Sequence, residues 1–357
     1  MPPGRITFLV PGDLASLTGG YGYDRQIIAG LQERGWTVDR VMLGGGFPWP
    51  DATVLRQAAA QIAAIPDGST VVADGLAFGA LPELAAMHAS RLRWVALVHH
   101  PLALEGGLRD RQRRQLFDSE RRALAHASAV IVTSAATARA LVGYGVAASL
   151  LQVVMPGTAR AALATGSAAS QGALSLLCVA ALIPRKGHAL LIEALAGLRD
   201  RKWTLHCVGS TTRDAATAGS VRAAIAAQGL EARVHLHGEL DADALHAFYD
   251  QADVFVLPSL HEGYGMALAE ALARGLPVVS STAGAIADTV PSAAGLLLPP
   301  GDGLALHRAL ARVLDEPGLR AELAAGARAA RMRLPSWAQA VEHFAAALGS
   351  GLPQPAP

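Results

Sequence analysis

The chain has 357 residues and a mass of 36.8 kDa, and at about 150 residues per domain this length predicts roughly two domains. Apolar residues make up 52%, which excludes a disordered chain, and the formal net charge of +1 excludes a strongly basic nucleic-acid-binding protein. Mean hydropathy is high at +0.31, but the longest apolar stretch, residues 173–183, is far shorter than the roughly 20 residues that a membrane-spanning helix needs. We therefore expect two well-filled cores and no membrane span.

The cysteines and the first residues indicate the compartment. Only two cysteines occur, Cys178 and Cys207, and each lies inside an apolar run. The residues before Ile6 lead directly into a strand-like run, without a secretory hydrophobic segment. We expect buried thiols, no disulfide and a cytoplasmic protein.

The first half alternates short apolar runs with segments of helical periodicity. Thr18–Gly22 is a glycine-rich turn between the first strand and the first helix. Alternation at this spacing predicts right-handed crossovers and a parallel sheet. The predicted strands are Ile6–Val10, Thr37–Leu43, Val71–Ala73, Trp94–Val98 and Ala129–Val132, and the predicted helices are Arg25–Arg34, Val54–Ala64, Ala80–Ala89 and Arg109–His126.

The second half repeats the pattern. Its strands again read as continuous apolar runs, which is typical of a parallel sheet covered on both faces. The predicted strands are Leu174–Ala180, Trp203–Val208, Val234–His237, Val254–Leu257, Pro277–Ser280 and Gly295–Leu298. The predicted helices are His188–Arg199, Val221–Gln228, Ala242–Gln251, Met266–Ala273, Leu304–Leu314, Pro317–Ala330 and Ser336–Leu348.

A linker candidate separates the halves. Residues 156–172 are small, polar and rich in glycine, serine and alanine. We predict an N-terminal domain over residues 1–168, a C-terminal domain over residues 169–335, and a last segment, residues 336–357, with an amphipathic helix that returns to the N-terminal domain and a tail. The fold class is α/β, with two doubly wound, Rossmann-like domains that face each other across a cleft and bind ligands at the carboxyl ends of their strands.

The densest group of polar residues follows the predicted strand Val254–Leu257. A loop with Gly263 and Gly265 leads into a helix, whose first N–H groups favour a phosphate or sugar hydroxyls. Two carboxylates are unsuited to one phosphate but fit hydroxyl groups, Glu262 on a sugar ring and Glu270 on a ribose. The alternative, to which position alone gives equal weight, is a helix-terminal charge at Glu262 and a solvated face at Glu270.

At this point the sequence resembles a known family. Residues 262–271 (EGYGMALAEA), followed by residues 275–280, are similar to the Glu-x7-Glu signature of glycosyltransferase family 4, whose members are retaining enzymes of the GT-B architecture. The resemblance extends over most of the second half and is looser in the first. Other segments that resemble the family, in order, are residues 184–188, 208–210, 233–238, 253–259 and 295–302.

The resemblance implies a donor site in the C-terminal domain. Glu262 would hold sugar hydroxyls, Glu270 the ribose, and Lys186 with Arg185 would neutralise the donor diphosphate as the leaving group gains charge. The alternative for Lys186 is a solvated helix N-terminus, which is unfavourable for a cation. Further donor contacts are implied for Gly209, Gly238, Gly263, Tyr264, Gly265 and Met266.

Two departures from the family pattern affect the donor geometry. Ala181 stands where the family usually has an arginine, so one contact to the diphosphate is missing unless Arg185 replaces it. Residues 284–288 keep only the first glycine of a Gly-Gly-x-Pro-Glu pattern and end in Asp288. The class of protein does not depend on either.

The acceptor side is implied in the first half. The turn with Gly19 and Gly20 resembles the family loop that faces the acceptor, although a plain strand-to-helix turn is the alternative. Arg25 stands where the dinucleotide fingerprint has its third glycine, which disfavours a nicotinamide site. His99 resembles the active-site histidine, which would hydrogen-bond the donor sugar or the acceptor, with His100 as second choice. A histidine satisfied by backbone at a strand end is the alternative.

Basic side chains also gather on the predicted helix Arg109–His126. Acidic residues interrupt them, so a solvated face is the first interpretation and contact with an anionic inner-membrane surface the second. His235 and His237 alternate along a strand without an identifiable third ligand, so we expect no zinc there. The basic residues are Arg109, Arg111, Arg113, Arg114, Arg121 and Arg122.

The resemblance therefore implies a retaining glycosyltransferase that moves a sugar from a nucleotide-sugar donor, UDP- or GDP-linked, to a small-molecule, glycan or lipid-linked acceptor. No Asp-x-Asp motif is placed to hold a metal-bound diphosphate, so we expect neither a metal nor another cofactor, and no nucleic-acid partner. The alternatives are another GT-B enzyme, such as a nucleotide-sugar epimerase or a phosphorylase, and a nucleotide-sugar-binding protein without turnover, which Ala181 supports. A dehydrogenase is more distant.

Overall fold

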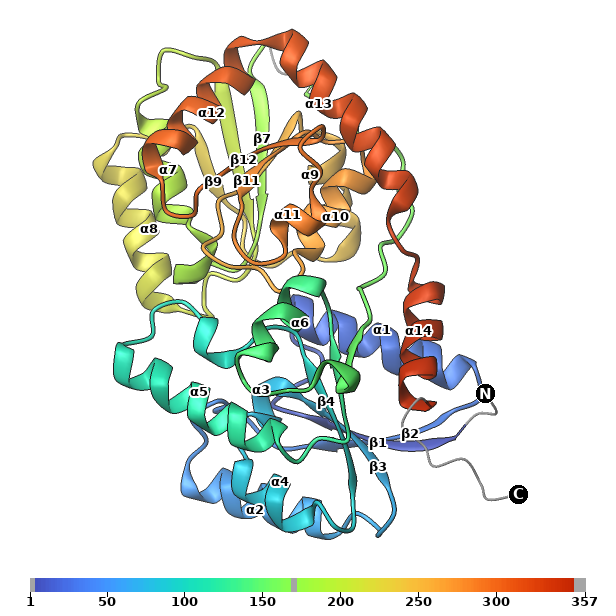
Figure 1. The fold of residues 1–357 in the computed structure, drawn as a ribbon. Helices are drawn as coiled ribbons and strands as arrows, with labels where there is room; N and C mark the ends of the chain where they lie inside the picture. Colours follow the sequence, from blue (N-terminus) through green and yellow to red (C-terminus); the bar gives the residue numbers. More distant parts are fainter. Residues whose placement is uncertain (1–3, 168–171, 350–357) are drawn as a thin grey trace. The chain divides into compact units, whose positions relative to one another are not determined.

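The computed structural model describes residues 4–167 and 172–349, and it divides into two compact units (Figure 1). Unit 1 comprises the described residues up to Gly157 and those from Pro335 onward, and unit 2 comprises Thr158–Leu334. Each unit contains one six-stranded sheet, all of whose strands are parallel. The two units are described separately.

In unit 1 the strands alternate with helices from the first residue described onward. The strands are β1 (Arg5–Val10), β2 (Thr37–Met42), β3 (Thr70–Asp74), β4 (Arg93–Val98), β5 (Ala129–Val132) and β6 (Leu151–Val153). The helices are α1 (Gly19–Glu33), α2 (Ala52–Ala63), α3 (Gly75–Phe78), α4 (Pro82–His88), α5 (Asp110–Leu124), α6 (Ala135–Val142) and α14 (Trp337–Gly349), with short 3₁₀ turns at Leu102–Leu104 and Ala148–Leu150.

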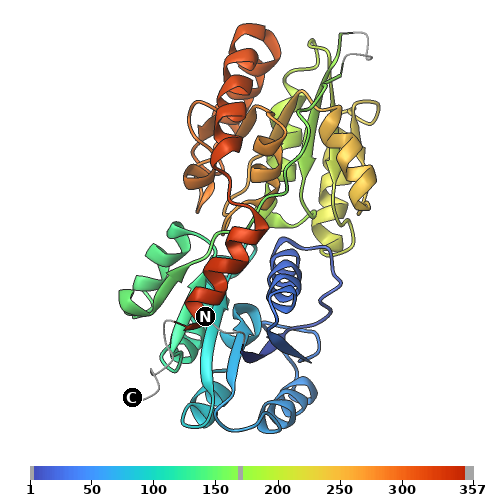
Figure 2. The same ribbon diagram turned by 90° about the vertical axis from the view of Figure 1, so that its right-hand side faces the viewer.

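The strand order in unit 1 is β2-β1-β3-β4-β5-β6, so the direction of winding reverses between β1 and β3. Helices cover both faces of the sheet, which is why its strands are apolar almost throughout. The last helix, α14, packs against α1, where Val341 lies against Gly30. In Figure 2, α14 (red) lies on the side of unit 1 that faces the viewer. A Cβ atom at Gly30 would lie 2.4 Å from a Val341 methyl carbon, so this glycine allows the two helices to approach closely.

In unit 2 the alternation continues. The strands are β7 (Leu174–Val179), β8 (Trp203–Val208), β9 (Val234–Leu236), β10 (Val254–Leu257), β11 (Val278–Ser281) and β12 (Gly295–Leu298). The helices are α7 (His188–Ala196), α8 (Ala215–Ala227), α9 (Ala242–Asp250), α10 (Met266–Ala273), α11 (Ile286–Thr289), α12 (Gly303–Asp315) and α13 (Pro317–Ala330), with 3₁₀ turns η3 (Pro184–Lys186) and η4 (Arg331–Arg333).

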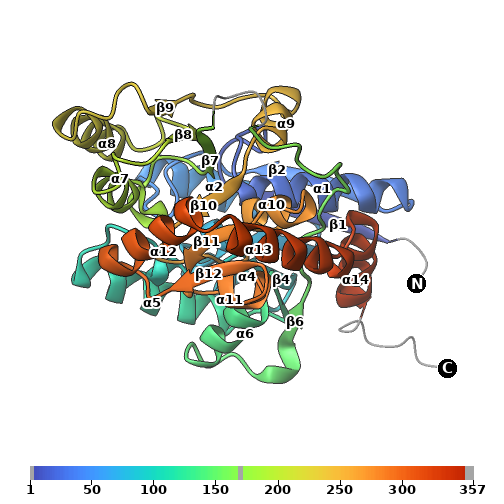
Figure 3. The ribbon, with the colours of Figure 1, turned by 90° about the horizontal axis from the view of Figure 1, so that it is seen from above.

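The strand order in unit 2 is β12-β11-β10-β7-β8-β9, and in Figure 3 the strand labels follow this order from β12 upward to β9. The winding reverses between β7 and β10, the two central strands. This is the strand order of the dinucleotide-binding Rossmann fold. The predicted fold class, α/β with two doubly wound domains, is therefore confirmed.

Several elements differ from the sequence prediction, and helices α3, α6 and α11 were not predicted. The glycine turn at Gly19 and Gly20 is the first turn of α1, because Thr18 Oγ1 caps the helix by accepting from the Tyr21 N–H over 3.2 Å. Helix α8 also starts earlier than predicted, because Asp214 caps it. Strand β6 was missed, since two half-buried residues and one exposed residue have too little pattern to be recognised.

The border between the units differs as well. The sequence placed it after residue 168, whereas the structure assigns Thr158–Ser167 to unit 2. The backbone N–H groups of Ala164, Thr165 and Gly166 donate to carbonyls of Arg274 and Asp250, and these bonds attach the segment to unit 2. Residues 168–171, which belong to the predicted linker, lie outside the described residues.

The two cysteines and the lengths of the helices bear on the expectations of buried thiols and of no membrane span. Cys178 and Cys207 are buried and form no disulfide. Within residues 4–167 and 172–349, every helix is too short or too polar to cross a bilayer.

Candidate functional site

The site of unit 2 lies where the winding of its sheet reverses. In doubly wound sheets, ligands bind outside the carboxyl ends of the strands at such a switch point. Here β7 continues into the turn η3, which carries Arg185 and Lys186, and the neighbouring strand β10 continues into the loop with Glu262. Residues some 76 positions apart in the chain therefore meet at one edge of the sheet.

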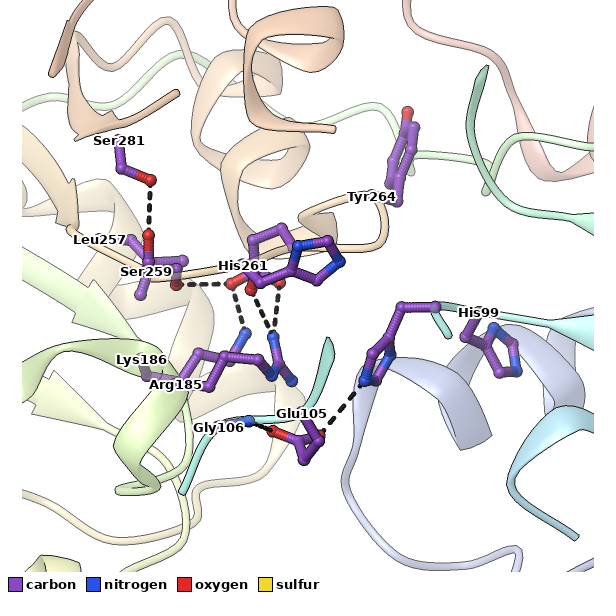
Figure 4. Close-up of polar contacts among 12 residues, drawn as sticks. His99, Glu105, Gly106, Arg185, Lys186, Leu257, Ser259, His261, Tyr264 and Ser281 are labelled. Atoms are coloured by element: carbon purple, nitrogen blue, oxygen red, sulfur yellow. Dashed lines mark hydrogen bonds and ion pairs between the residues drawn. The ribbon is translucent and has the colours of Figure 1, made fainter. Parts of the chain in front are cut away.

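Glu262 lies between two cationic side chains. The Lys186 ammonium donates to Glu262 Oε1 over 2.6 Å, and Arg185 Nη1 lies 3.4 Å from Glu262 Oε2. Ser259 Oγ also donates to Oε1, over 2.6 Å. Figure 4 shows Arg185 and Lys186 pointing together toward the loop that carries Ser259 and His261, and Arg185 donates to the His261 carbonyl over 2.7 Å. Protein partners thus replace water around this carboxylate, which is buried.

These partners determine the charge of the site. Burial by itself raises the pKa of Glu262, but the charges of Lys186 and Arg185 and the hydrogen bonds from Lys186 and Ser259 outweigh it and lower the pKa to about 2. Glu262 is therefore ionised at neutral pH and only accepts hydrogen bonds. The two cationic side chains beside this carboxylate suit an anionic ligand.

A glycine brings the two loops together. Gly187 has a φ of +74°, and a Cβ atom there would lie 2.4 Å from the Pro258 carbonyl oxygen, so only glycine permits this approach. The Leu260 N–H then donates to the Arg185 carbonyl over 2.7 Å. This backbone contact places Lys186 within reach of the loop after β10.

A second glycine supports Glu262 from behind. Gly284 has a φ of +63°, and a Cβ atom there would lie 2.2 Å from the Glu262 carbonyl oxygen. The Ala285 N–H donates to the same oxygen over 2.9 Å. The glycine that this chain keeps from the family pattern therefore fixes the backbone of Glu262, whereas Asp288, which departs from the pattern, lies within the short helix α11.

Glu270 has a separate set of partners. It lies on α10, and its Oε2 accepts from the Tyr249 hydroxyl over 2.9 Å. Arg274 lies over the Tyr249 ring, 4.2 Å from its centroid, and donates to the Glu270 carbonyl over 3.1 Å. Burial raises the pKa of Glu270, and the Tyr249 hydrogen bond and the charge of Arg274 oppose that rise. Glu262 and Glu270 thus differ in charge environment although both lie in the signature segment.

Two predicted glycines follow the neighbouring strands. Gly209 comes directly after β8 with a φ of +147°, and a Cβ atom there would lie 2.2 Å from the Ala180 carbonyl oxygen. Gly238 follows β9 with a φ of +72°, and a Cβ atom there would meet nothing within 4 Å. Both lie at the carboxyl edge of the sheet, but only Gly209 is required by the packing.

The remaining predicted residues form the entry to α10. Gly265, with a φ of +88°, precedes Met266, the first residue of the helix. Tyr264 is buried, and Thr289 Oγ1 donates to its carbonyl over 2.8 Å. Gly263 lies in the same loop, so the structure brings this predicted set together at one helix N-terminus. Their contacts with a ligand remain predictions.

Unit 1 has a cluster of opposite charge at its own switch point. His99 follows β4, and its Nε2 lies 3.2 Å from Asp24 Oδ1 and 3.6 Å from Asp74 Oδ2. Asp24 comes from α1 and is fully buried, and Asp74 ends β3 and accepts from the Leu76 N–H over 2.7 Å. A Cβ atom at Gly20 would lie 3.3 Å from the His99 ring, so this glycine allows α1 to start beside the imidazole.

The two aspartates hold a proton on the histidine. Burial lowers the pKa of His99, but the charges and hydrogen bonds of Asp24 and Asp74 outweigh it and raise the pKa to about 10. Burial also raises the pKa of Asp24 to about 7, against the attraction of His99. Because His99 is an imidazolium at neutral pH, it can donate hydrogen bonds but does not accept a proton.

The other predicted residues of unit 1 lie differently. His100, the second choice, is directed at Glu105, with 3.3 Å between Nε2 and Oε2. Gly19 is the first residue of α1. The arginines of the predicted basic helix lie on or beside α5, where Arg122 forms a 2.8 Å ion pair with Glu83 and Arg113 donates to the Ala103 carbonyl over 3.3 Å.

Four residues of these clusters had no predicted role. Asp24 lies one residue before the predicted start of its helix, and Asp74 directly follows an apolar strand, which is the kind of position that could have been recognised. Ser259 ends the segment 253–259, which precedes the signature, and no role was predicted for its side chain. Tyr249 carries no local signal at all, because only the packing of α9 on α10 reveals its contact with Glu270.

Two comparisons of sequence place this architecture in a known class. The family model described as glycosyl transferases group 1 matches residues 165–330, and the model described as glycosyltransferase family 4 matches residues 43–159. Together the two models cover most of the chain. The chain belongs to the family 4, group 1 glycosyltransferases.

Individual relatives agree with this class. The D-inositol 3-phosphate glycosyltransferase of Acidothermus cellulolyticus is 33% identical over 278 residues, which are 70% of this chain and 61% of the relative. The 2-deoxystreptamine glucosyltransferase of Streptomyces kanamyceticus is 37% identical over 145 residues, 40% of this chain and 36% of the relative. The matches thus span less than two thirds of the length of these relatives.

Solved structures share the fold. Sucrose-phosphate synthase from Thermosynechococcus elongatus superposes with a TM-score of 0.83 at 21% identity, covering 97% of this chain and 98% of the other. Anabaena HepE in complex with UDP and glucose superposes with a TM-score of 0.75 at 21% identity, covering 97% and 99%. At this identity the likeness establishes the GT-B class of fold.

Proposed function

We propose that the protein is a retaining, metal-independent glycosyltransferase that takes a sugar from a nucleotide-sugar donor bound by unit 2. The observation that supports the proposal is the arrangement of Lys186 and Arg185 around Glu262 at the switch point of the sheet. It provides an ionised carboxylate for sugar hydroxyls beside two cationic side chains for a diphosphate.

The cationic side chains would act on the leaving group. When the bond between sugar and diphosphate breaks, negative charge grows on the diphosphate oxygens, and fixed cations in a partly buried site stabilise that charge. Lys186 and Arg185 are 16% and 12% exposed, so water screens them little. Arg185, which also reaches the His261 carbonyl, would take the place of the arginine that is absent at Ala181. The proposed metal independence rests on this pair.

The donor would be a UDP- or GDP-sugar. The support is the complex of the HepE neighbour with UDP and glucose, together with the family membership of this chain. Glu270, with Tyr249 behind it, would accept hydrogen bonds from the ribose hydroxyls. Retention would follow from attack by the acceptor on the face from which the diphosphate leaves.

The acceptor would bind to unit 1. Because Asp24 and Asp74 keep His99 protonated, we propose that His99 donates a hydrogen bond to a hydroxyl of the donor sugar or the acceptor, rather than removing a proton. The departing diphosphate would then accept the acceptor proton. Contact of α5 with a membrane surface, a lipid-linked acceptor and a cytoplasmic location remain predictions.

Nucleotide binding tests the donor side. A nucleotide present at 100 times its Kd stabilises the folded protein by about 2.7 kcal/mol, so a thermal-shift panel of UDP, GDP and ADP identifies the base. We expect UDP or GDP to raise Tm, and Lys186→Met to abolish the shift. Lys202→Met is the matched control, since Lys202 is the only other lysine and is exposed. Equal shifts in both variants would contradict the donor site.

Product analysis tests the reaction. UDP-glucose or GDP-mannose would be incubated with inositol 3-phosphate and with 2-deoxystreptamine, the compounds that the names of two relatives suggest as acceptor probes. NMR should show an α-linked product from the α-linked donor, and EDTA should leave the rate unchanged. The alternative that Ala181 supports, binding without turnover, predicts nucleotide binding and no product with any acceptor. An inverted product would refute the proposed stereochemistry.

A further inference from the structure

The chain places both of its cysteines at one point of unit 2. Cys178 on β7 and Cys207 on β8 are partners in the register of two neighbouring parallel strands, so their side chains lie on the same face of the sheet. His188, the first residue of α7, lies against the same face. The three side chains are 0%, 1% and 2% exposed, in the order Cys178, Cys207, His188.

The distances fit a bound metal ion. One ligand atom from each of the three residues lies within 4.8 Å of the others, and Cys178 Sγ is 3.6 Å from His188 Nε2. Zinc bonds of about 2.3 Å to sulfur and about 2.0 Å to nitrogen, at a tetrahedral angle, place the two ligand atoms about 3.5 Å apart. The observed separation therefore already has the length of one edge of a zinc tetrahedron.

The chemistry of the three groups points the same way. Two thiols and one imidazole are the ligand types that select a thiophilic divalent ion.

We propose that Cys178, His188 and Cys207 bind one Zn²⁺ ion as a structural site inside unit 2. The ion would link the central strand β7, its neighbour β8 and the start of α7. Since His188 follows Lys186 and Gly187 in the chain, the ion would also hold the turn η3 in place. A buried water molecule would complete the fourth position. This site is independent of the proposed sugar transfer, and its metal would not contact the diphosphate.

Metal content is the direct measurement. Because the site is buried, the protein would be unfolded under reducing conditions and refolded with one equivalent of Zn²⁺, then passed through a desalting column and assayed by mass spectrometry of the metal. We expect about one Zn²⁺ per chain in the wild type and less than a tenth of that in Cys178→Ser/Cys207→Ser. His206→Gln is the matched control, since His206 precedes Cys207 on β8 with its side chain on the opposite face, and it should retain the ion.

Cobalt provides a second measurement that does not depend on how well a variant folds. Refolding the wild type with Co²⁺ should produce the intense near-ultraviolet absorption of thiolate-to-cobalt charge transfer, and added Zn²⁺ should remove it. His188→Gln keeps both thiols and should weaken Co²⁺ binding at least tenfold. Circular dichroism of each variant identifies those that fail to fold.

Three results would overturn the proposal. The first is a wild-type protein that folds fully and holds less than a tenth of an equivalent of Zn²⁺. The second is a Zn²⁺ content in Cys178→Ser/Cys207→Ser that equals that of the wild type. The third is an intact mass two hydrogens below the reduced value after folding in air with Zn²⁺, which would identify a Cys178–Cys207 disulfide in place of the metal. None of these results bears on nucleotide binding, so this proposal and the proposed function can fail separately.

Discussion

The two units use the same architecture to build clusters of opposite charge. In unit 1 one imidazole lies between two buried carboxylates, Asp24 and Asp74, whereas in unit 2 one carboxylate, Glu262, lies between two cations. Each cluster stands at the point where the winding of a parallel sheet reverses. The fold therefore fixes the place, and a few residues just beyond the strand ends decide whether that place favours an anion or holds a proton.

The opposite charges of the two clusters give them different chemistry. The aspartates of unit 1 stabilise a cation, so His99 remains a hydrogen-bond donor. The lysine and arginine of unit 2 stabilise an anion, so Glu262 remains an acceptor. Removing a carboxylate beside His99 should lower the pKa of His99, whereas removing a cation beside Glu262 should weaken the binding of an anion.

The largest effect is expected in unit 2. Glu262→Gln and Lys186→Met should each lower kcat/KM by 10²-fold or more, the range found when one preorganised electrostatic partner is removed. Their effects on UDP or GDP binding should differ in sign. Lys186→Met should weaken binding at least tenfold, whereas Glu262→Gln, which removes a negative charge beside the diphosphate, should leave Kd unchanged or lower it. Isothermal titration calorimetry measures this difference, and weaker nucleotide binding in a folded Glu262→Gln would contradict the assigned roles.

In unit 1 we expect a change in proton affinity. Asp24→Asn and Asp74→Asn should each lower the pKa of His99, because the two carboxylates are what raises it. The larger drop should come from Asp24, which is closer to Nε2. NMR titration of the His99 ring resonances measures this, and the alkaline limb of the pH–rate profile should move to lower pH with it. Asp67→Asn, an exposed carboxylate of the same unit, is the control.

An unchanged His99 titration in both asparagine variants would show that the aspartates only fill space. A loss of activity without any shift in the pH profile would also argue for a structural role. These outcomes leave the prediction for unit 2 untouched.

The sequence was sufficient for the framework and for the cluster of unit 2. Continuous apolar runs at regular spacing predicted both sheets, and β8, β10 and β12 have the predicted bounds, because buried parallel strands leave a strong local pattern. Arg185, Lys186 and Glu262 were all expected, because they lie in segments that resemble a family motif. Their contact was not, since it depends on the order of the strands, which places β7 beside β10.

The cluster of unit 1 was predicted only in part. His99 was expected from its place after a strand, but Asp24 and Asp74 were not, because they come from two other elements that no local pattern links to it. The border after residue 168 was wrong for the same kind of reason, since backbone bonds to Asp250 and Arg274 hold the preceding segment on unit 2. Tertiary contacts, rather than local propensity, decided these features.

The stability of the two clusters should depend on pH in opposite ways. The pKa of Glu262 in the folded protein lies below its ordinary value of 4.5. Its ionised form therefore adds up to about 3 kcal/mol to the free energy of unfolding above pH 4.5, and this contribution is lost as the pH falls toward 2. The folded pKa of His99 lies above 6.5, so its contribution is present below pH 6.5 and lost as the pH rises toward 10.

Urea unfolding at a series of pH values measures both limbs. Glu262→Gln should flatten the acid limb only, and His99→Gln the alkaline limb only. A variant that flattens both limbs equally would show that the clusters do not titrate independently.

The smallest effect is expected from two buried tyrosines. Tyr249 and Tyr23 are both fully buried. The Tyr249 hydroxyl donates to Glu270 Oε2 over 2.9 Å, with the Ala267 carbonyl as a second acceptor at 3.3 Å, and the Tyr23 hydroxyl donates to the Val154 carbonyl over 3.1 Å. Tyr249→Phe and Tyr23→Phe should each cost about 1 kcal/mol in the free energy of unfolding.

Only Tyr249→Phe should also weaken UDP or GDP binding, by less than tenfold. Without the hydroxyl the pKa of Glu270 rises further, because that hydrogen bond opposes the effect of burial, and a larger share of Glu270 is then protonated and unable to accept from both ribose hydroxyls. The loss in affinity should therefore grow as the pH is lowered, whereas Tyr23→Phe should bind as the wild type does at every pH. Equal nucleotide affinity in the two variants across the pH range would remove Glu270 from the donor site and leave Tyr249 a structural role.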